Sequence, residues 1–358
     1  MNILALIKKT LSWLDDHILT LLTAILIVLI PLYPKIPLAD LIEGYIVRMR
    51  LEDIFIAFTL FIYCVQLLRK KITLPNNMLT KLMLGYIVVG ALSSFSALFI
   101  TKSVPLLESH VFKLVLHLLR RVEYFSLFVI AYSSIKTKKD LKLFVITAFL
   151  TLIATIVYGF GQKYLYWPAF STMNREFSKG MRLYLTPTSR VMSTFGGHYD
   201  YAAYLMMSLT ALIPALWLVK HKLLKLVIGI TALAAYWSLI LTASRTSFGG
   251  YIAGLTAVTI LLATTKGLWW AVRRYLLVMA VSITMMLTIG DLSERFLQVV
   301  QSPSAMHQLI PWIEAGKIEL EHKAFDLYET VQEAIELIFP IAAGKDAVAL
   351  GLDRNSQR

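Results

Sequence analysis

The feature that most constrains the fold is a series of apolar runs that are nearly free of strong charge. An α-helix needs about 20 such residues to cross the hydrocarbon core of a bilayer, where every backbone polar group must be bonded within the protein. We count nine runs of this kind, joined by polar connections. The predicted spans are residues 17–34, 52–68, 79–100, 111–134, 141–163, 199–219, 222–242, 246–265 and 272–290.

The composition indicates a membrane protein. Hydrophobic residues make up 58% of the 358 residues and charged residues only 16%, and the mean hydropathy is +0.68. A soluble domain carries about 25% charged residues. We therefore predict an all-α fold, a polytopic transmembrane helical bundle of about nine spans. The chain contains one cysteine, Cys64, which excludes a framework of disulfides within it.

Basic residues between the spans predict the orientation, because short cytoplasmic connections collect Lys and Arg. When the N-terminus lies inside, loops rich in Lys and Arg alternate with loops poor in them along the whole series of spans. The inner connections then hold 16 basic residues: Lys8, Lys9, Arg69, Lys70, Lys71, Lys81, Lys136, Lys138, Lys139, Lys142, Lys220, Lys222, Lys225, Lys266, Arg273 and Arg274. This pattern predicts a multi-pass protein of the cytoplasmic membrane and argues against nucleic-acid binding.

The chain divides into two predicted parts. Residues 1–290 form the bundle, with a long outer loop at 164–198. Residues 291–358 carry six basic and eleven acidic residues, whereas the preceding part carries 29 and 11. The stretch 304–339 has the apolar periodicity of amphipathic helices. We interpret 291–358 as an extracytoplasmic helical segment, the start of a large outer loop.

Two arginines stand at the outer ends of apolar runs, where a charge is costly unless a polar or anionic group receives it. Arg190 precedes the sixth span, and Arg245 follows the seventh within Ser244-Arg245-Thr246. A guanidinium stays charged and its planar fork suits phosphate or carboxylate. We predict that both converge on one anionic ligand. Ser244 and Thr246 are candidate substrate-binding residues, although a solvated turn would use the same hydroxyl groups.

The sixth span opens with Gly196-Gly197-His198-Tyr199-Asp200. Glycines permit close backbone approach, and the free amides at a helix start suit an anion. His198 is a candidate acid or base, or else a polar residue at the membrane interface. We predict that Tyr199 contacts substrate and favour Asp200 as a helix cap over a catalytic base.

The fourth span places charges near half-depth, where they must face the bundle interior or a wet cavity. Arg120 and Glu123 are three residues apart and share a helix face. Either they form a structural ion pair between helices, or they line a cavity for a charged ligand. We carry Arg120, Arg121 and Glu123 as candidate substrate-binding residues. The phosphate-loop, zinc-protease and serine-hydrolase motifs are absent from the sequence, so we expect no metal and no cofactor.

The two arginine segments resemble those of the O-antigen ligase and polymerase superfamily, which also contains bacterial protein O-oligosaccharyltransferases. In that superfamily an arginine precedes a turn that enters a helix, and a Thr-x-Ser-Arg motif follows about one helical hairpin later. Here the two correspond to residues 190–204 and 241–250, and residues 120–124 resemble a polar patch of the corresponding helix. The resemblance covers roughly residues 18–300.

The resemblance implies a metal-independent glycosyltransferase of surface-polysaccharide biosynthesis in the cell envelope. Its donor would be a glycan linked to undecaprenyl diphosphate, used at the extracytoplasmic face, and its acceptor a hydroxyl of a glycan, lipid or protein. Arg190 and Arg245 would bind the diphosphate and stabilise its charge as it leaves. We place His198 with them as the third candidate catalytic residue.

The chain departs from the superfamily pattern in its turn, where Gly197-His198-Tyr199-Asp200 replaces an Asn-rich sequence, and at its C-terminal end. Members usually have ten or more spans, end inside and carry a histidine base in a large outer loop. Here His307 and His322 stand in charged, helical surroundings. We therefore expect a C-terminal truncation, with the base histidine beyond Arg358. The alternatives are a multi-span transporter that uses the charged site of the fourth span, and a non-catalytic scaffold that displays residues 291–358.

Overall fold

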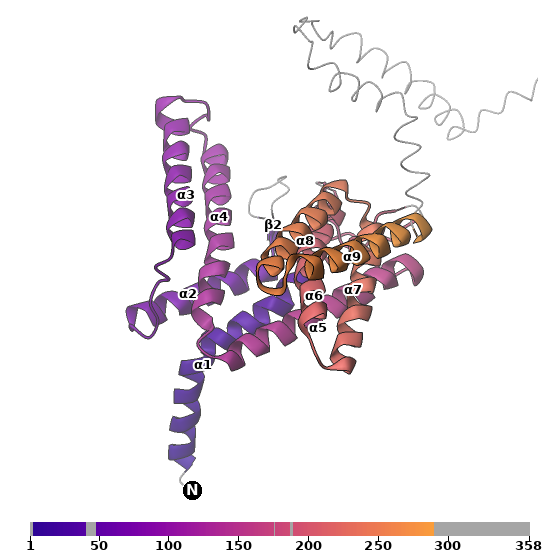
Figure 1. The fold of residues 1–358 in the computed structure, drawn as a ribbon. Helices are drawn as coiled ribbons and strands as arrows, with labels where there is room; N and C mark the ends of the chain where they lie inside the picture. The colour runs from indigo at the N-terminus through magenta and orange to yellow at the C-terminus, as the bar shows by residue number, and fades with distance from the viewer. Residues whose placement is uncertain (1–2, 41–47, 175, 187–188, 290–358) are drawn as a thin grey trace, which may run out of the picture. The chain divides into compact units, whose positions relative to one another are not determined.

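The computed structural model describes residues 3–40, 48–174, 176–186 and 189–289. In this part of the chain the backbone forms nine α-helices and little else (Figure 1). The helices are α1 (Ile3–Leu32), α2 (Leu51–Leu68), α3 (Met78–Phe95), α4 (Glu108–Ser134), α5 (Lys138–Tyr164), α6 (His198–Leu218), α7 (Lys222–Thr242), α8 (Arg245–Lys266) and α9 (Leu268–Ile289). The predicted outer segment 291–358 lies outside the described residues.

Shorter elements complete the description. A π-helical turn, η1 (Ser96–Ile100), continues α3, and a 3-10 turn, η2 (Phe177–Lys179), lies in the loop before α6. Two short strands, β1 (Ala39–Asp40) and β2 (Arg48–Met49), pair antiparallel between α1 and α2. Sequence analysis did not predict this strand pair, because two residues are too few to show an alternating pattern.

The all-α prediction is confirmed, and each of the nine predicted spans corresponds to one helix of the described residues. Eight of these helices are long and apolar enough to cross a membrane. The ninth is α4, which carries Glu108, Lys113, Arg120, Arg121 and Glu123. Helix α1 is longer than the predicted span 17–34, since it begins at Ile3. Residues 3–16 contain no Gly or Pro to prevent this extension.

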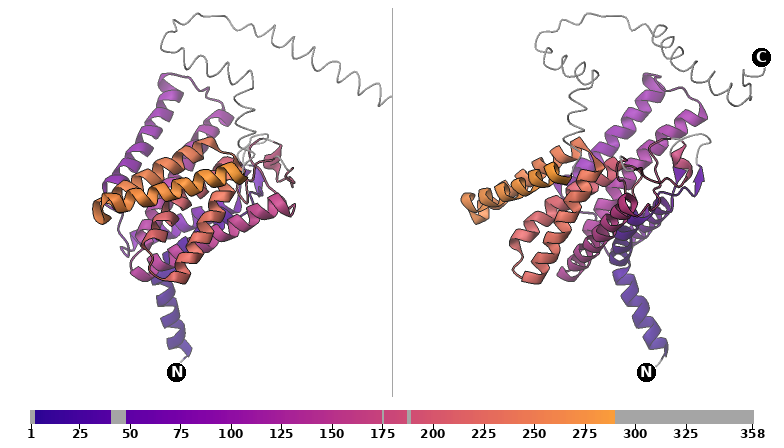
Figure 2. Two further views of the ribbon diagram at one scale, coloured as in Figure 1. Left: turned by 45° about the vertical axis from the view of Figure 1, so that its right-hand side comes forward. Right: turned by 90° about the vertical axis from the view of Figure 1, so that its right-hand side faces the viewer.

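The helices pack in two groups around separate clusters of buried side chains. In the larger cluster α6 contacts both α7 and α8, and α8 contacts α9, the two orange helices that lie side by side in Figure 2. Tyr201, Leu205 and Leu255 are fully buried there. The smaller cluster joins α1, α2 and α4 through Leu19, Tyr63 and Ile130.

Helix α3 contacts α4, and most of its large apolar side chains are exposed. Its apolar window has no buried residue, and many of its large side chains, such as Leu82, Val89 and Leu92, are more than half exposed. Lipid tails solvate such side chains as well as a protein interior does. The described residues are therefore compatible with a multi-pass membrane protein.

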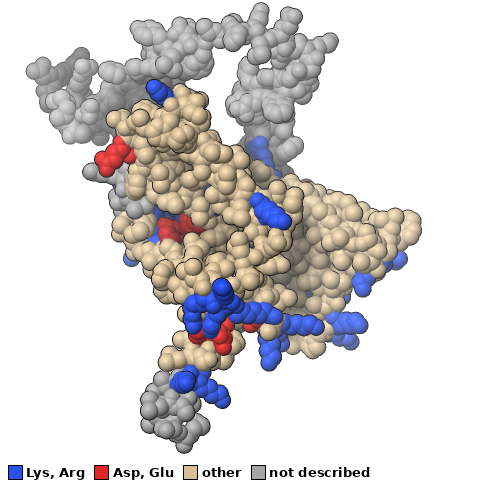
Figure 3. Space-filling view, turned by 90° about the vertical axis from the view of Figure 1, so that its left-hand side faces the viewer, with Lys and Arg blue, Asp and Glu red and all other residues tan. Residues whose placement is uncertain are grey.

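One end of the helices carries a cluster of charges, which we call the Asp15 end. Arg69 donates to both carboxylate oxygens of Asp15, at 2.6 and 2.8 Å, and Lys71 donates to it at 2.5 Å. Lys136, between α4 and α5, lies 3.4 Å from the carbonyl oxygen of Asp16. Figure 3 shows Lys and Arg gathered in a band on the lower part of one face, with acidic atoms among them.

The other end, which we call the Arg190 end, is where α1, α5 and α7 finish and α2, α6 and α8 begin. The loop before α6 ties these elements together. Thr194 donates its hydroxyl to the carbonyl oxygen of Pro31 in α1, and Gln162 of α5 donates to the carbonyl oxygen of Ser193 at 2.8 Å. Residues 191–198 are all buried, so this loop is part of the core.

Candidate functional site

Arg190 is held by the first residue of α6. Its Nη1 donates to Nε2 of His198 across 2.9 Å. A guanidinium has only donors, so Nε2 must accept, and the imidazole is neutral with its proton on Nδ1. His198 is 6% exposed, whereas Arg190 is exposed beside it. The contact therefore orients an exposed cation by means of a buried neutral ring.

Arg245 is placed by a tight turn between α7 and α8. Ala243 adopts a left-handed conformation with φ of 50°, which ends α7, and α8 begins with Arg245 itself. Ser244 is 1% exposed, and its Oγ lies 2.9 Å from Oγ of Ser247. Arg245 is exposed and has no hydrogen bond or ion pair among the described residues. The turn therefore presents a permanent positive charge that no acidic side chain of the described ranges neutralises.

The segments that carry the two arginines touch each other. The backbone N–H of Val191 donates to the carbonyl oxygen of Leu241 across 3.1 Å. This bond joins the residue after Arg190 to the last turn of α7, just before Arg245. The two arginine segments thus share one end of the helices, as predicted, and their convergence on one ligand stays a prediction.

A charged cavity of about 500 Å³ opens at the same end. Its walls come from the ends of α1 and α2, one face of α4 and the segment that enters α6. Lysine, arginine, aspartate and glutamate side chains dominate the polar part of the lining. The lining residues are Ile30, Lys35, Arg50, Glu52, Asp53, Ile56, Lys113, Leu116, His117, Arg120, Glu123, Tyr124, Leu127, Thr172, Phe195, Gly196 and Asp200.

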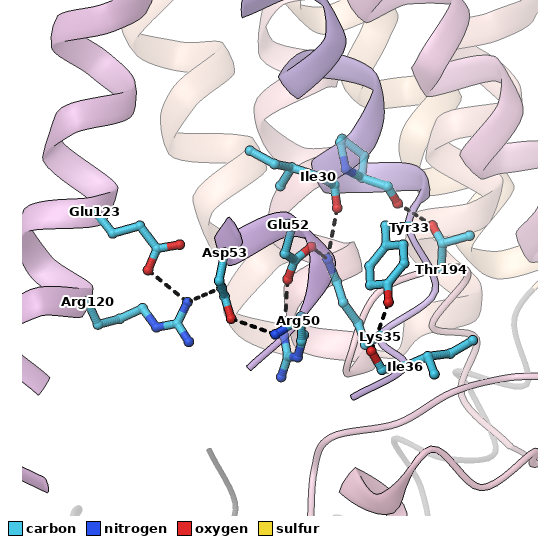
Figure 4. A network of polar contacts seen from close by, with 11 residues as sticks. Ile30, Tyr33, Lys35, Ile36, Arg50, Glu52, Asp53, Arg120, Glu123 and Thr194 are labelled. Carbon is cyan, nitrogen blue, oxygen red and sulfur yellow. Dashed lines mark hydrogen bonds and ion pairs between the residues drawn. The ribbon is translucent and has the colours of Figure 1, made fainter. Parts of the chain in front are cut away.

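Arg120 links α2 and α4 in the wall of this cavity. Its Nη1 donates to Asp53 at 2.7 Å and to Glu123 at 2.9 Å, and Figure 4 shows the arginine between the two carboxylates. The three side chains are each 18 to 27% exposed. Both interpretations of the fourth span therefore apply, because the residues form an ion pair between helices and also line a cavity. Arg120 is not a free charge for a ligand.

A second ion pair lies beside the first (Figure 4). Lys35 bonds to Glu52 and donates to the carbonyl oxygen of Ile30 at 2.8 Å, and Arg50 reaches Glu52 at 3.2 Å. Burial lowers the pKa of Lys35, and the negative charge of Glu52 opposes this shift. A buried lysine is tolerable because it has both a charge partner and a carbonyl acceptor.

Sequence analysis missed Lys35, Arg50, Glu52 and Asp53. A signal was present: Arg50, Glu52 and Asp53 lie at the start of the second predicted span, and Lys35 directly follows the first, all on the predicted outer side. Arg50 and Asp53 also have the spacing of a helix cap, and the backbone N–H of Arg50 donates to the Asp53 carboxylate at 3.0 Å.

The formal charges around the cavity balance. Four basic residues (Lys35, Arg50, Lys113 and Arg120) face four acidic ones (Glu52, Asp53, Glu123 and Asp200). Such a lining offers many donors and acceptors and no excess of either sign, which suits a neutral polyhydroxyl compound. Arg190 and Arg245 have no acidic partner among the described residues, so they suit an anion.

Arg121 lies apart from the cavity. It donates to the hydroxyl of Tyr86 in α3 at 2.7 Å, and its guanidinium stands 5.8 Å from the centre of that ring. The physical reason is helix geometry, since adjacent residues of a helix point about 100° apart. Because Arg120 points into the cavity, Arg121 points away from it. The structure gives Arg121 a packing contact between α3 and α4.

The remaining candidates lie at the start of α6 and α8. Tyr199 is exposed, with its ring centre 4.0 Å from that of His198, and Thr246 is exposed beside Arg245. Asp200 was favoured as a helix cap, and this interpretation is wrong. Gly197 occupies the cap position, and Asp200 lines the cavity without a hydrogen bond among the described residues.

Gly196 brings the loop and the start of α6 together. The backbone N–H of Thr172 donates to its carbonyl oxygen at 2.7 Å, and Ser171 Oγ donates to the same oxygen at 3.1 Å. A Cβ at position 196 would overlap Oγ1 of Thr172. A protein segment therefore makes the close approach at this glycine, and the binding of an anion here stays a prediction.

No group of three or more His, Cys, Asp or Glu side chains in the described ranges is arranged to hold a metal ion. Comparison of the chain with family models, with curated proteins and with solved structures found no match. The function must therefore be argued from the site itself.

Proposed function

We propose that the chain is a membrane glycosyltransferase that moves an oligosaccharide from a polyprenyl-diphosphate carrier to an acceptor hydroxyl. One observation carries the proposal: two unlike sites adjoin at the start of α6. Gly196 and Asp200 line a charge-balanced cavity, while His198 between them holds the exposed Arg190. A lipid-linked glycan has the same two parts, a polyhydroxyl sugar and an anionic diphosphate.

Arg190 and Arg245 would bind the diphosphate. Negative charge develops on the leaving diphosphate as the glycosidic bond breaks, and fixed cations stabilise that charge without a metal. The backbone bond between Val191 and Leu241 holds the two arginine segments at one end. His198 would position Arg190, because its Nε2 lone pair already accepts from the guanidinium.

The charged cavity would receive sugar residues of the donor or acceptor. Carboxylates of Asp53, Glu123 and Asp200 accept from sugar hydroxyls, and the aromatic ring of Tyr124 offers an apolar face. A volume of about 500 Å³ falls within the common range for small-ligand sites, roughly 300–1,000 Å³. This assignment gives Arg120 and Glu123 a role in substrate binding and leaves Arg121 outside it.

The proposal includes an orientation. With the N-terminus inside, the basic cluster at the Asp15 end faces the cytoplasm, which agrees with the tendency of Lys and Arg to stay there. The Arg190 end then faces the extracytoplasmic side of the cytoplasmic membrane. The acceptor hydroxyl would belong to a glycan, a lipid or a protein, which corresponds to polymerase, ligase or protein glycosylation activity.

A transporter is the second candidate, and one observation favours it. The α4 residues that line the cavity extend from Lys113 to Leu127, so the cavity reaches from the Arg190 end to the middle of the helix. A charged cavity at that depth is common in transport pathways. A transporter would carry a solute across proteoliposomes without breaking a glycosidic bond, which distinguishes the two functions.

A transfer assay tests the glycosyltransferase. Membranes that contain the protein are supplied with an undecaprenyl-diphosphate-linked oligosaccharide, and the release of the carrier is followed. We expect Arg245→Ala to lower the rate about 100- to 1,000-fold, as loss of one charge-stabilising donor does elsewhere. The matched control is Arg273→Ala, an exposed arginine of α9. Equal rates for Arg245→Ala and the parent protein, at equal membrane content, would contradict the proposal.

A further inference from the structure

A second cavity, of about 490 Å³, lies among α6, α7, α8 and α9. Its walls are mostly Leu, Ile, Val and Met side chains, so it differs in chemistry from the charged cavity. The deep polar groups already have partners: Tyr251 and Ser282 lie 3.1 Å apart, oxygen to oxygen. A polar ligand would lose its hydrogen bonds to water here and find few new partners. A hydrocarbon chain makes no hydrogen bonds to water, so it would enter the cavity without this cost.

The apolar cavity is an elongated groove along α7. Its α7 residues recur every three to four positions on one helix face, from Lys222 through Lys225, Gly229 and Ala232 to Tyr236. At about 1.5 Å per residue this face is roughly 21 Å long. One leaflet of a bilayer has a hydrocarbon depth of about 15 Å, half of the core thickness. The groove is therefore long enough for an acyl chain of one leaflet.

Positive charge marks one end of the groove. Lys222 and Lys225 lie in the first turn of α7, are exposed and form no ion pair among the described residues. The free amides of the same helix start also favour an anion, although His221 Nδ1 accepts from one of them, that of Leu224, at 3.3 Å. The opposite end of α7 carries Leu241, at the Arg190 end.

We propose that this groove binds one acyl chain of an anionic glycerophospholipid, with the lipid phosphate at Lys222 and Lys225. The apolar walls bind the acyl chain, and the two lysines favour a negatively charged headgroup. In the N-inside orientation this lipid belongs to the cytoplasmic leaflet. It is distinct from the diphosphate-linked donor, because the lysines and Arg245 lie at opposite ends of the helices.

Bound lipid would complete the packing of α9. The groove is lined from this helix by Leu277, Val281 and Met285, and from α7 by residues such as Gly229 and Ala232. An acyl chain between the two helices supplies the contacts that a cavity lacks. We therefore expect the lipid to raise the thermal stability of the protein.

Native mass spectrometry of the protein in a neutral detergent tests the proposal. Phosphatidylglycerol and phosphatidylcholine with identical acyl chains are added separately, and bound lipid is counted. We expect the protein to bind phosphatidylglycerol about 10- to 30-fold more tightly, because each lysine adds to the attraction for an anionic headgroup. The double variant Lys222→Gln/Lys225→Gln should bind both lipids equally.

Two further variants separate the groove from general surface charge. Gly229→Leu should lower the binding of both lipids, since the new side chain extends into the groove and a Cβ there meets Leu216 Cδ1 at an ordinary 3.5 Å. Lys138→Gln/Lys139→Gln, two exposed lysines at the start of α5, should keep the preference. Equal binding of both lipids by the parent protein, or an unchanged preference in the Lys222→Gln/Lys225→Gln variant, overturns the proposal. Neither result bears on glycan transfer, which is measured at the other end.

Discussion

At the scale of single residues, the two proposed catalytic arginines differ in what holds them. Arg190 is oriented by a neutral imidazole, and Arg245 only by the turn from which it projects. A hydrogen bond to a charged group contributes about 1.5–3 kcal/mol. The His198 contact is therefore strong enough to fix the guanidinium. An acidic partner would neutralise its charge, whereas the neutral imidazole does not.

Substitutions of His198 test this positioning role. His198→Gln supplies an amide oxygen that accepts from Arg190, so we expect it to keep most of the transfer activity. His198→Leu removes the acceptor and should lower the rate about 10- to 100-fold, which corresponds to the loss of one charge-assisted hydrogen bond. The rates are compared across pH. A steep loss in both variants, with the loss of a titrating step from the pH profile of the parent protein, would show instead that His198 transfers a proton.

Sequence predicts such contacts only when the partners are close along the chain. The spacing of Arg120 and Glu123 predicted a shared helix face, and their bond is confirmed. Asp53, the second partner of Arg120, lies 67 residues earlier, and no local pattern links the two. The same reason explains why the placement of Lys35 and Glu52 in the cavity wall was missed.

At the scale of elements, the length of the apolar runs determines most of the fold. A run of about 20 apolar residues has few alternatives to a helix, so the helices follow from the sequence. The segment before α6 could not be predicted in the same way. Its burial depends on bonds to Pro31, Gln162 and Leu241, which belong to three separate helices. Sequence analysis predicted only a long outer loop at 164–198.

Close packing of α6 and α8 depends on two glycines one turn apart. A Cβ at Gly254 would overlap Cγ2 of Thr210, and one at Gly250 would overlap Sδ of Met206. Small residues at this spacing allow helices to approach closely in a membrane. The α6–α8 contact in turn supports the helix starts that carry His198 and Arg245.

Gly254→Leu should therefore destabilise the protein by about 1–3 kcal/mol, the usual range for overpacking. Gly249→Leu is the control, because no atom lies within 4 Å of a Cβ built there. The measurement is thermal unfolding in detergent. A similar melting temperature for the two variants would show that the α6–α8 contact does not depend on Gly254.

At the scale of the whole molecule, the described helices have two chemically different ends. At the Asp15 end Arg69 and Lys71 are paired with the carboxylate of Asp15. The Arg190 end combines a charge-balanced cavity with two arginines that have no acidic partner in the described ranges. This asymmetry is what the glycosyltransferase proposal requires, since the carrier diphosphate and the sugar must meet at one face.

The most direct test of the central claim is a binding measurement on the purified protein in lipid nanodiscs. Undecaprenyl diphosphate without sugar is compared with the oligosaccharide-linked form. We expect Arg190→Ala/Arg245→Ala to weaken binding of both forms about 100-fold or more, because two charge-assisted contacts are lost. Asp200→Asn should weaken only the form that carries sugar, since Asp200 lines the cavity. If the double arginine variant binds undecaprenyl diphosphate as tightly as the parent protein, the Arg190 end does not hold the carrier and the account is contradicted.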